Sequence, residues 1–581
     1  MKNHKVYLLF AFLGTVFAVP ELRAQVLYGS LIGTVSDQSG AVVPKATVTI
    51  SNAQTGQTRE TTTDSEGRFS LQNVQPGTYE MKVGSAGFRT MARTNVAISI
   101  NTVTRVPVEL EVGQVADQVT VEGAAAALQT DKTDVHVELG ETQVRNLPLP
   151  RYRNYQSLIN LVPGATPGRY QNSPGSTPGR SLTTNVNGVN RNNNVTKLDG
   201  AVTVHIWLPH HTAYVAPADT IETVNISTNN FDAEQGMAGG AAITVITKSG
   251  TNELHGSAFL MHDNSRFGAK NFFFRDPKTP KSLVTVPGFT VGGPILKNKL
   301  FFFGGWEGLR ERVNRSRLFT VPTADQRAGN FSRYPTTMFD PLTGNLNGTG
   351  RTPFVGNLIP GSRISPVARK LVDLTPLPNQ LGDNNNYFAS GTQSMDRDNF
   401  DAKINWNATN KFQMFGKYGV MNALVKGEFG LGAAGGPCVC DGGIGDAKVT
   451  AQVSTIGWTY TFSPTFLWDG VAGWTRTGSS GNPRDLGTDF GTKTLGIPGT
   501  NGASIRESGM PSFAVSGYTD LGNPEGWNPY FYSDTSYTVN QNFSVVKSTH
   551  DIRFGVEGVR HWLNHWQPEI GFGPRGRFIF N

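Results

Sequence analysis

The chain has 581 residues, which is too long for one ordinary domain, so we expect several. Only 38% of the residues are hydrophobic and the mean hydropathy is −0.29, which excludes a bundle of membrane-spanning helices but not a transmembrane β-barrel, whose strands alternate apolar and polar residues. Aromatic residues make up 10% of the chain, and the formal net charge of +7 comes without a dense run of Lys and Arg, so the composition argues against a disordered chain and against nucleic-acid binding.

The start of the chain predicts export. Two lysines precede the apolar run from Val6 to Phe17, which has the length of a signal-peptide core and is too short to span a bilayer as a helix. Cleavage after Ala18 or Ala24 is compatible with the small residues there, and we place the signal peptide at residues 1–24. A buried N-terminal helix is the alternative interpretation.

Residues 25–113 predict a small β-sandwich, because short β-rich runs alternate with turns such as Ser39-Gly40. The motif residues are Gly33-x-Val35-x-Asp37-x-x-Gly40, Pro44-x-Ala46-x-Val48, Thr63-Asp64-x-x-Gly67-x-Phe69, Pro76-Gly77-x-Tyr79 and Gly87-Phe88. This pattern resembles the carboxypeptidase regulatory-like domain, which implies an immunoglobulin-like or transthyretin-like fold. The resemblance implies a folding or interaction unit without catalytic residues, and the chain contains no His-Glu-x-x-His zinc motif. A carbohydrate-binding module is the alternative.

The coupling strip, as we call Asp117 to Gly123, follows the sandwich. It loosely resembles the short TonB box by which TonB-dependent outer-membrane receptors pair an extended strand with their energy-coupling protein. Strand addition requires an unpaired strand on a flexible tether. The candidate TonB contact residues are Asp117, Val119, Thr120 and Val121. An ordinary last strand of the sandwich is an equally good interpretation of the same residues.

Residues 114–250 predict an α+β plug domain. The segments that resemble plug positions of the same receptor family are Asn146-Leu-Pro-Leu-Pro-Arg151, Leu158-Ile-Asn-Leu-Val-Pro-Gly164, Asn185-Val-Asn-Gly188 and Leu198-Asp199-Gly200. The residues that resemble the plug-to-barrel junction of that family are Gly239, Gly240, the run from Ile243 to Thr251, and Gly256. We interpret the Asp-Gly pair as a tight turn in preference to a ligand site. Two β-branched runs, Ile221–Thr228 and Ile243–Thr247, flank a Gly/Ala turn region and mark the junction with the following domain.

A histidine cluster lies within the predicted plug. His205, His210 and His211 fall within seven positions, with Trp207 between them, and imidazole suits Fe, Cu and Zn. No Cys or carboxylate stands beside them at a recognisable ligand spacing, so we assign no metal. These four residues are a weak candidate ligand-binding site, and a polar plug loop facing the barrel lumen is the preferred interpretation.

From residue 251 to 581 the sequence predicts part of an antiparallel transmembrane β-barrel with about ten strands. The clearest strand places Phe400, Ala402, Ile404 and Trp406 on one face and Asp401, Lys403, Asn405 and Asn407 on the other. Such a strand has a lipid face and a lumen face. Short turns alternate with long connections, which we place at 310–397, 421–449 and 478–534 and expect to be extracellular.

Two further features concern the same half of the chain. Barrels of this receptor family have about 22 strands, so the resemblance implies that the present chain is a fragment or is truncated relative to the family. Cys438 and Cys440 lie in a Gly-rich loop that we expect to be outside the inner membrane, where a disulfide is the favoured state.

The sequence therefore predicts a mostly β protein with an immunoglobulin/transthyretin-like sandwich, an α+β plug and the N-terminal part of an antiparallel barrel. The resemblance implies an outer-membrane TonB-dependent receptor that imports a scarce nutrient: a siderophore, an oligosaccharide or a peptide. The implied partners are TonB, outer-membrane lipid and the substrate, with no cofactor. A surface adhesion or structural protein is the alternative. We find no nucleophile or metal constellation and expect no enzymatic activity.

Overall fold

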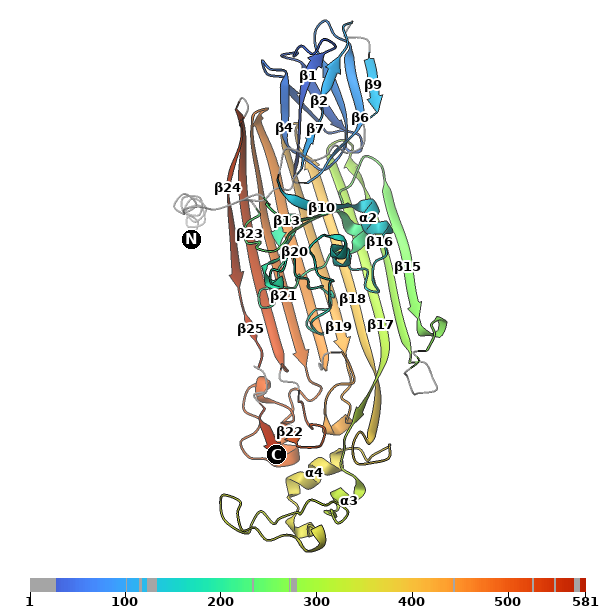
Figure 1. The fold of residues 1–581 in the computed structure, drawn as a ribbon, viewed down its shortest axis with the longest axis vertical. Coiled ribbons are helices and arrows are strands. Elements are labelled where there is room, and N and C mark those ends of the chain that lie inside the picture. Colours follow the sequence, from blue (N-terminus) through green and yellow to red (C-terminus); the bar gives the residue numbers. More distant parts are fainter. Residues whose placement is uncertain are drawn as a thin grey trace, which may run out of the picture.

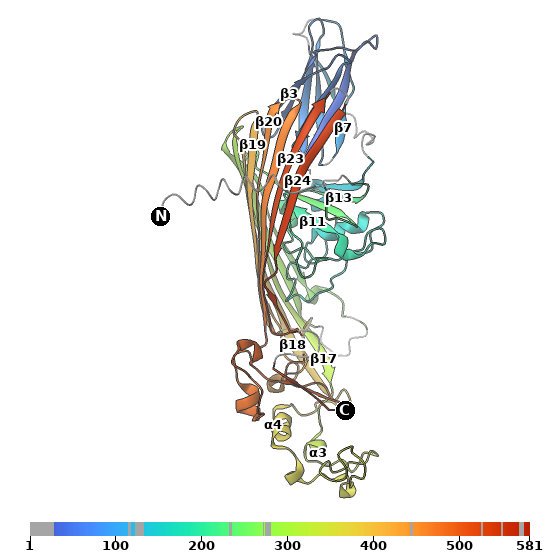
Figure 2. The ribbon, with the colours of Figure 1, turned by 90° about the vertical axis from the view of Figure 1, so that its left-hand side faces the viewer.

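The computed structural model describes residues 28–100, 102–113, 118–122, 133–231, 235–270, 272, 280–441, 445–524, 527–547, 550–568 and 575–580. A β-sandwich lies at one end of a large antiparallel sheet, and a plug lies against one face of that sheet (Figure 1 and Figure 2). The predicted signal peptide and Asp117 lie outside the described residues. No helix among the described residues is long and apolar enough to cross a membrane.

The sandwich consists of two sheets. One has the strand order β4-β1-β7, with β8 also pairing with β1, and the other has the order β3-β2-β5-β6-β9. The strands are β1 (Gly29–Asp37), β2 (Thr47–Asn52), β3 (Thr58–Thr62), β4 (Arg68–Val74), β5 (Gly77–Gly84), β6 (Thr90–Ile98), β7 (Val103–Arg105), β8 (Val108–Leu110) and β9 (Gln118–Glu122). Alternate residues of both sheets, such as Leu31, Ile50 and Met81, are buried between them. The inward-facing residues of the alternating strands thus form the core, as in other β-sandwiches.

The plug contains a five-stranded sheet of order β10-β13-β14-β11-β12. Its elements are β10 (Val135–Gly140), α2 (Glu141–Asn146), η2 (Tyr155–Leu161), η3 (Arg191–Asn193), β11 (Val195–Leu198), β12 (Ala201–Val202), η4 (Ala218–Thr220), β13 (Ile221–Asn229) and β14 (Ala242–Thr247). Asp199 and Gly200 join β11 to β12 with φ angles of 45° and 90°, the left-handed backbone that a tight turn of this kind needs. The apolar core of the plug continues into Met421, Val449 and Val453 of the large sheet.

The large sheet has the order β15-β16-β17-β18-β19-β20-β21-β23-β24, with the short β25 also paired to β23. The strands are β15 (His255–Asn264), β16 (Ser282–Leu296), β17 (Leu300–Phe319), β18 (Tyr387–Asn407), β19 (Phe412–Lys426), β20 (Asp446–Ser463), β21 (Phe466–Asn482), β23 (Tyr530–Lys547), β24 (His550–Trp562) and β25 (His565–Trp566). The sheet is curved and the plug lies against its concave face (Figure 2). Within the described residues β15 and β24 are its edge strands, so the sheet is an open portion of a barrel wall.

The two faces of the sheet differ as the sequence predicts. In β18 the side chains of Phe400, Ile404 and Trp406 are 48%, 49% and 43% exposed on the convex face. The alternate residues Asp401 and Lys403 are 6% and 5% exposed and face the plug. Phe400 aligns with Val420 of β19 and Trp406 with Met414, so the apolar band continues across the strands. This arrangement is that of a barrel with lipid outside and a polar lumen.

The long connections are shorter than predicted, because the strands extend further. They span residues 320–386, 427–445 and 483–529, at the end of the sheet opposite the sandwich (Figure 1). Beyond the apolar band the outward side chains are polar and pair with one another: Arg310 lies 2.9 Å from Asp398 and Arg312 lies 2.8 Å from Asp396. A prediction based on apolar alternation therefore places the end of each strand too early.

The connections contain short elements of their own. These are η5 (Ser265–Phe267), α3 (Ala324–Arg327), η6 (Val355–Asn357), η7 (Gly361–Arg363), α4 (Pro366–Leu374), η8 (Gly432–Ala434), η9 (Phe490–Leu495), η10 (Ile505–Glu507), β22 (Ser512–Val515) and β26 (Arg577–Phe580). Strands β22 and β26 form a separate parallel pair beyond the large sheet. The other ends of the long strands are joined by tight turns, such as 408–411 between β18 and β19.

Candidate functional site between the plug and the sheet

The tight turn of the plug holds a buried ion pair with the sheet. Lys403 of β18 places its Nζ 2.9 Å from Asp199 Oδ1 and donates a second hydrogen bond of 2.8 Å to the Thr247 carbonyl oxygen. The Thr247 hydroxyl donates to the other Asp199 oxygen at 2.6 Å. Both charged side chains are almost inaccessible to water, so their mutual contact and these hydrogen bonds replace the lost hydration.

A second polar contact between plug and sheet involves Asp401, which lies two positions before Lys403 on the same face of β18. The Tyr214 hydroxyl of the plug donates to Asp401 Oδ2 at 2.7 Å, and Lys417 of β19 lies 3.0 Å from Asp401 Oδ1. The Lys417 ammonium also sits 4.8 Å from the centre of the Tyr214 ring. Burial raises the pKa of the Tyr214 phenol well above its usual range, and the Asp401 carboxylate adds to the effect. The phenol therefore stays protonated and remains a donor.

Arginines from both sides form a third contact. Arg153 of the plug lies 2.6 Å from Asp219 and 3.4 Å from Glu307 of β17, and Glu307 also accepts from Arg397 of β18 at 3.0 Å. Arg397 donates a further bond of 3.3 Å to the carbonyl oxygen of Pro178 in the plug. One glutamate thus joins an arginine of the plug to an arginine of the wall.

The far edge of the sheet repeats the arrangement. Lys197 of β11 lies 2.6 Å from Glu557 of β24, and both side chains are buried. Removing one member of a buried pair leaves an uncompensated charge, whereas the intact pair contributes little net stability. The plug is therefore fixed in one position by contacts that depend strongly on geometry.

The sequence pattern did not identify these residues as contacts between the plug and the sheet. The alternation did place Asp401 and Lys403 on the wet side of β18, and that is the signal that could have indicated them. Their partners Asp199 and Tyr214 lie about 200 positions away in a turn and a loop, where no periodicity indicates a partner. Only the packing of the plug against the sheet brings them together.

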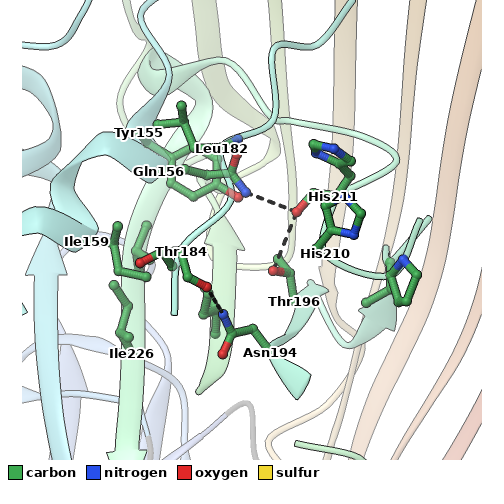
Figure 3. Close-up of a pocket in the computed structure, with 15 residues that line it drawn as sticks. Tyr155, Gln156, Ile159, Leu182, Thr184, Asn194, Thr196, His210, His211 and Ile226 are labelled. Carbon is green, nitrogen blue, oxygen red and sulfur yellow. Dashed lines mark hydrogen bonds between the residues drawn. The ribbon is translucent and has the colours of Figure 1, made fainter. Parts of the chain in front are cut away.

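The residues of the histidine cluster lie in two different environments. His210 and His211 lie side by side, with ring centres 4.3 Å apart, at the wall of a small plug cavity of about 40 Å³ (Figure 3). His205 accepts a hydrogen bond from the Leu208 N–H, and Trp207 packs on His565 of the sheet at 4.7 Å. Within the described residues no group of three or more His, Cys, Asp or Glu side chains could hold a metal ion.

Burial governs the protonation of these imidazoles. It lowers the pKa of His205 to about 4, of His210 to about 4 and of His211 to about 3. All are therefore neutral near pH 7. The cavity beside His210 and His211 has room for only a few water molecules. A ligand role for the cluster stays a prediction.

The described part of the coupling strip is strand β9. It pairs in parallel with β6, with Val119 opposite Met91, Thr120 opposite Ala92 and Val121 opposite Arg93. The backbone of these residues thus takes the place that a last strand of the sandwich would take, which is one of the two interpretations open from the sequence. Asp117 lies outside the described residues, so the structure describes no contact for it.

Cys438 and Cys440 are joined by a disulfide in the connection between β19 and β20, with their Cα atoms 5.1 Å apart. The next residue, Asp441, lies 3.9 Å from Arg180 of the plug and 3.8 Å from Arg315 of β17. The small ring is therefore adjacent to a point where the connection between β19 and β20 approaches the plug.

Comparison with known proteins agrees with this arrangement. Residues 30–111 match the carboxypeptidase regulatory-like domain. The TonB-dependent transporter Oar of Myxococcus xanthus is 27% identical over 582 residues, which cover 92% of this chain and 50% of the relative, so the chain spans about half the length of this curated relative.

Solved structures with which the chain can be aligned include two outer-membrane proteins. The siderophore receptor PirA of Acinetobacter baumannii is 13% identical with a TM-score of 0.40, over 73% of this chain and 48% of that one. The outer-membrane transporter YddB of Escherichia coli is 10% identical with a TM-score of 0.44, over 73% and 48%. Residues 246–581, more than half of the chain, match the model of the outer membrane beta barrel domain. The chain therefore belongs to the outer membrane beta barrel domain family and is a protein of the outer membrane.

Proposed function

We propose that this protein is a TonB-dependent transporter that imports a scarce nutrient across the outer membrane. The observation that carries the proposal is the plug seated on the inner face of the sheet through buried ion pairs, of which Asp199 with Lys403 is the most enclosed. A wall lined in this way opens a path only if the plug moves. The similarity to a TonB-dependent transporter supports a pull by TonB as the source of that movement.

The same proposal assigns a role to each domain. The sandwich at 25–113 and the strip Asp117 to Gly123 face the periplasm, the plug at 114–250 closes the lumen, and the wall from 251 onward contacts lipid. Substrate binds at the extracellular connections and the outer side of the plug. Transport of this kind requires no bond to be made or broken in the substrate, so we propose neither an enzymatic activity nor a cofactor.

Growth of a deletion strain on single sources of iron, carbon and nitrogen identifies the nutrient. The full-length gene then restores growth, and the variant Val119→Pro should not, because proline removes a backbone donor from the strip that TonB would pair with. Val119→Ala keeps that donor and is the matched control. Restoration by Val119→Pro at normal surface display, or uptake that survives a protonophore, would refute energy coupling through the strip.

A surface adhesion or structural role is the second candidate, and one observation favours it. The connection 320–386 exposes several large apolar side chains to solvent at the end opposite the sandwich. Leu342, Leu346, Val355 and Leu381 belong to this group. Exposed apolar surface of this kind is typical of binding sites. An adhesin would keep its attachment in a strain that lacks TonB, which separates the two functions.

A further inference from the structure

The coupling strip is not an isolated segment in this structure. Strand β9 pairs with β6 over the whole length Thr90 to Thr94, in an unbroken parallel register. It forms the edge of the sheet β3-β2-β5-β6-β9, so one side of its backbone faces β6 and, among the described residues, the other side faces no strand. Residues that TonB would need in an extended, mobile form are thus built into a folded domain.

That domain is in turn attached to the rest of the molecule. Asn73 of the sandwich donates a 2.7 Å hydrogen bond to Asp469 of β21, whose other oxygen accepts from Asn542 of β23. The Asn252 N–H, which precedes β15, donates to the Gln54 carbonyl oxygen at 2.9 Å. Asn225 of the plug sheet donates to the Ile100 carbonyl oxygen at 3.3 Å. The sandwich is therefore docked on both the plug and the wall.

We infer that the sandwich sequesters the coupling strip, so that β9 must leave β6 before TonB can pull on the plug; this inference rests on the proposed function. While β9 remains paired, a force applied to it is borne by the sandwich and by its contacts with the wall. Only a released β9 transmits the force through residues 123–134 to β10 of the plug. The sandwich is thus an inhibitory partner of the strip, and its pairing with β9 sets the fraction of molecules that TonB can use.

The size of the effect follows from that fraction. When only a fraction of a protein is competent to bind, its apparent dissociation constant is the intrinsic one divided by that fraction. Fixing β9 to β6 covalently reduces the fraction toward zero. We therefore expect a locked strip to lose TonB binding by at least about tenfold, and an unlocked strip of identical sequence to regain it.

A reversible lock is available at the end of β9 nearer the plug. Thr94 of β6 and Glu122 of β9 are aligned, and neighbouring strands lie about 4.8 Å apart, within the range that a disulfide spans. The double variant Thr94→Cys with Glu122→Cys is made in the full-length protein, with Cys438 and Cys440 replaced by serine. A matched pair, Thr49→Cys with Glu60→Cys, links β2 to β3 in the same sheet and does not touch β9.

The assay measures binding of the purified periplasmic domain of TonB to each protein in detergent, after oxidation and again after reduction. The inference expects weak binding of the oxidised Thr94/Glu122 pair, recovery on reduction, and no redox effect in the Thr49/Glu60 pair. Equal binding by the oxidised and reduced Thr94/Glu122 protein would overturn sequestration, since TonB would then use the strip in place or another segment. Absence of TonB binding by a free peptide that spans Asp117 to Gly123, which no sandwich can sequester, would overturn the proposed function itself, which is a different result.

Discussion

Lys403 offers the sharpest test of how the plug is held. In the variant Lys403→Met the Asp199 carboxylate stays buried and loses its cation, and breaking a buried pair in this way costs roughly 3–5 kcal/mol. Asp199 retains two donors from Thr247, the N–H at 3.1 Å and the hydroxyl at 2.6 Å. We therefore expect the lower end, about 3 kcal/mol, which corresponds to a factor of roughly 150 in the equilibrium for local opening.

Hydrogen exchange measures this opening directly. Amides of β11 and β12 should exchange roughly 100-fold faster in Lys403→Met, while those of the sandwich should not change. Lys411→Met, in the exposed turn at the end of the same hairpin, is the matched control and should have no effect. The double variant Asp199→Asn with Lys403→Met should recover most of the protection, because no charge is left unpaired. An increase below about fivefold in the single variant, or a double variant as unprotected as the single one, would refute the reasoning.

Three further experiments test the orientation of the barrel, its lipid face and the buried histidine loop. Protease added to intact cells should cut within 320–386 and spare the turn 408–411; cleavage at the turn would reverse the orientation of the barrel. Ile404→Lys, on the lipid face, should cost roughly 2–4 kcal/mol in urea unfolding from lipid vesicles, and a cost near zero would mean that this face does not contact lipid. The loop 205–212 should lose protection from hydrogen exchange as the pH falls from 6.5 toward 4. Folding lowers the pKa of His205 to about 4, so the unfolded loop binds the proton more readily throughout that interval; protection independent of pH would refute this.

The lipid face of the wall can be predicted from the sequence, because it depends only on the alternation of residues within each strand. Apolar residues recur there with period two, as in Phe400, Ala402, Ile404 and Trp406, because the bilayer requires an apolar side chain at each outward position. The requirement stops applying where the strand leaves the bilayer. Arg310 and Arg312 continue β17 outward with polar side chains that pair across to β18. For this reason the hairpins could be predicted and the lengths of their strands could not.

The sequence alone does not determine which sheet the coupling strip joins. Val119 and Val121 suit a strand, and the residues alone do not say which sheet the strand joins. Parallel pairing with β6 requires the chain to return along the sandwich after β8, and this path is set by how the two sheets pack. The sequence alone therefore allows both interpretations, a last strand of the sandwich and a strand that pairs with TonB.

The buried charges at the plug lie beside apolar contacts with Met421, Val449 and Val453, and the two kinds of contact respond differently to movement. An apolar interface resists separation by about 25 cal/mol for each Å² exposed to water, whatever the direction of movement. The pair of Asp199 and Lys403 resists only until water reaches it, because each charge then regains the hydration that it lost on burial. A contact of this kind therefore opposes small displacements and stops opposing movement once water reaches it. In the transport proposed for this protein, the same contacts would close the pathway at rest and reform after each displacement of the plug.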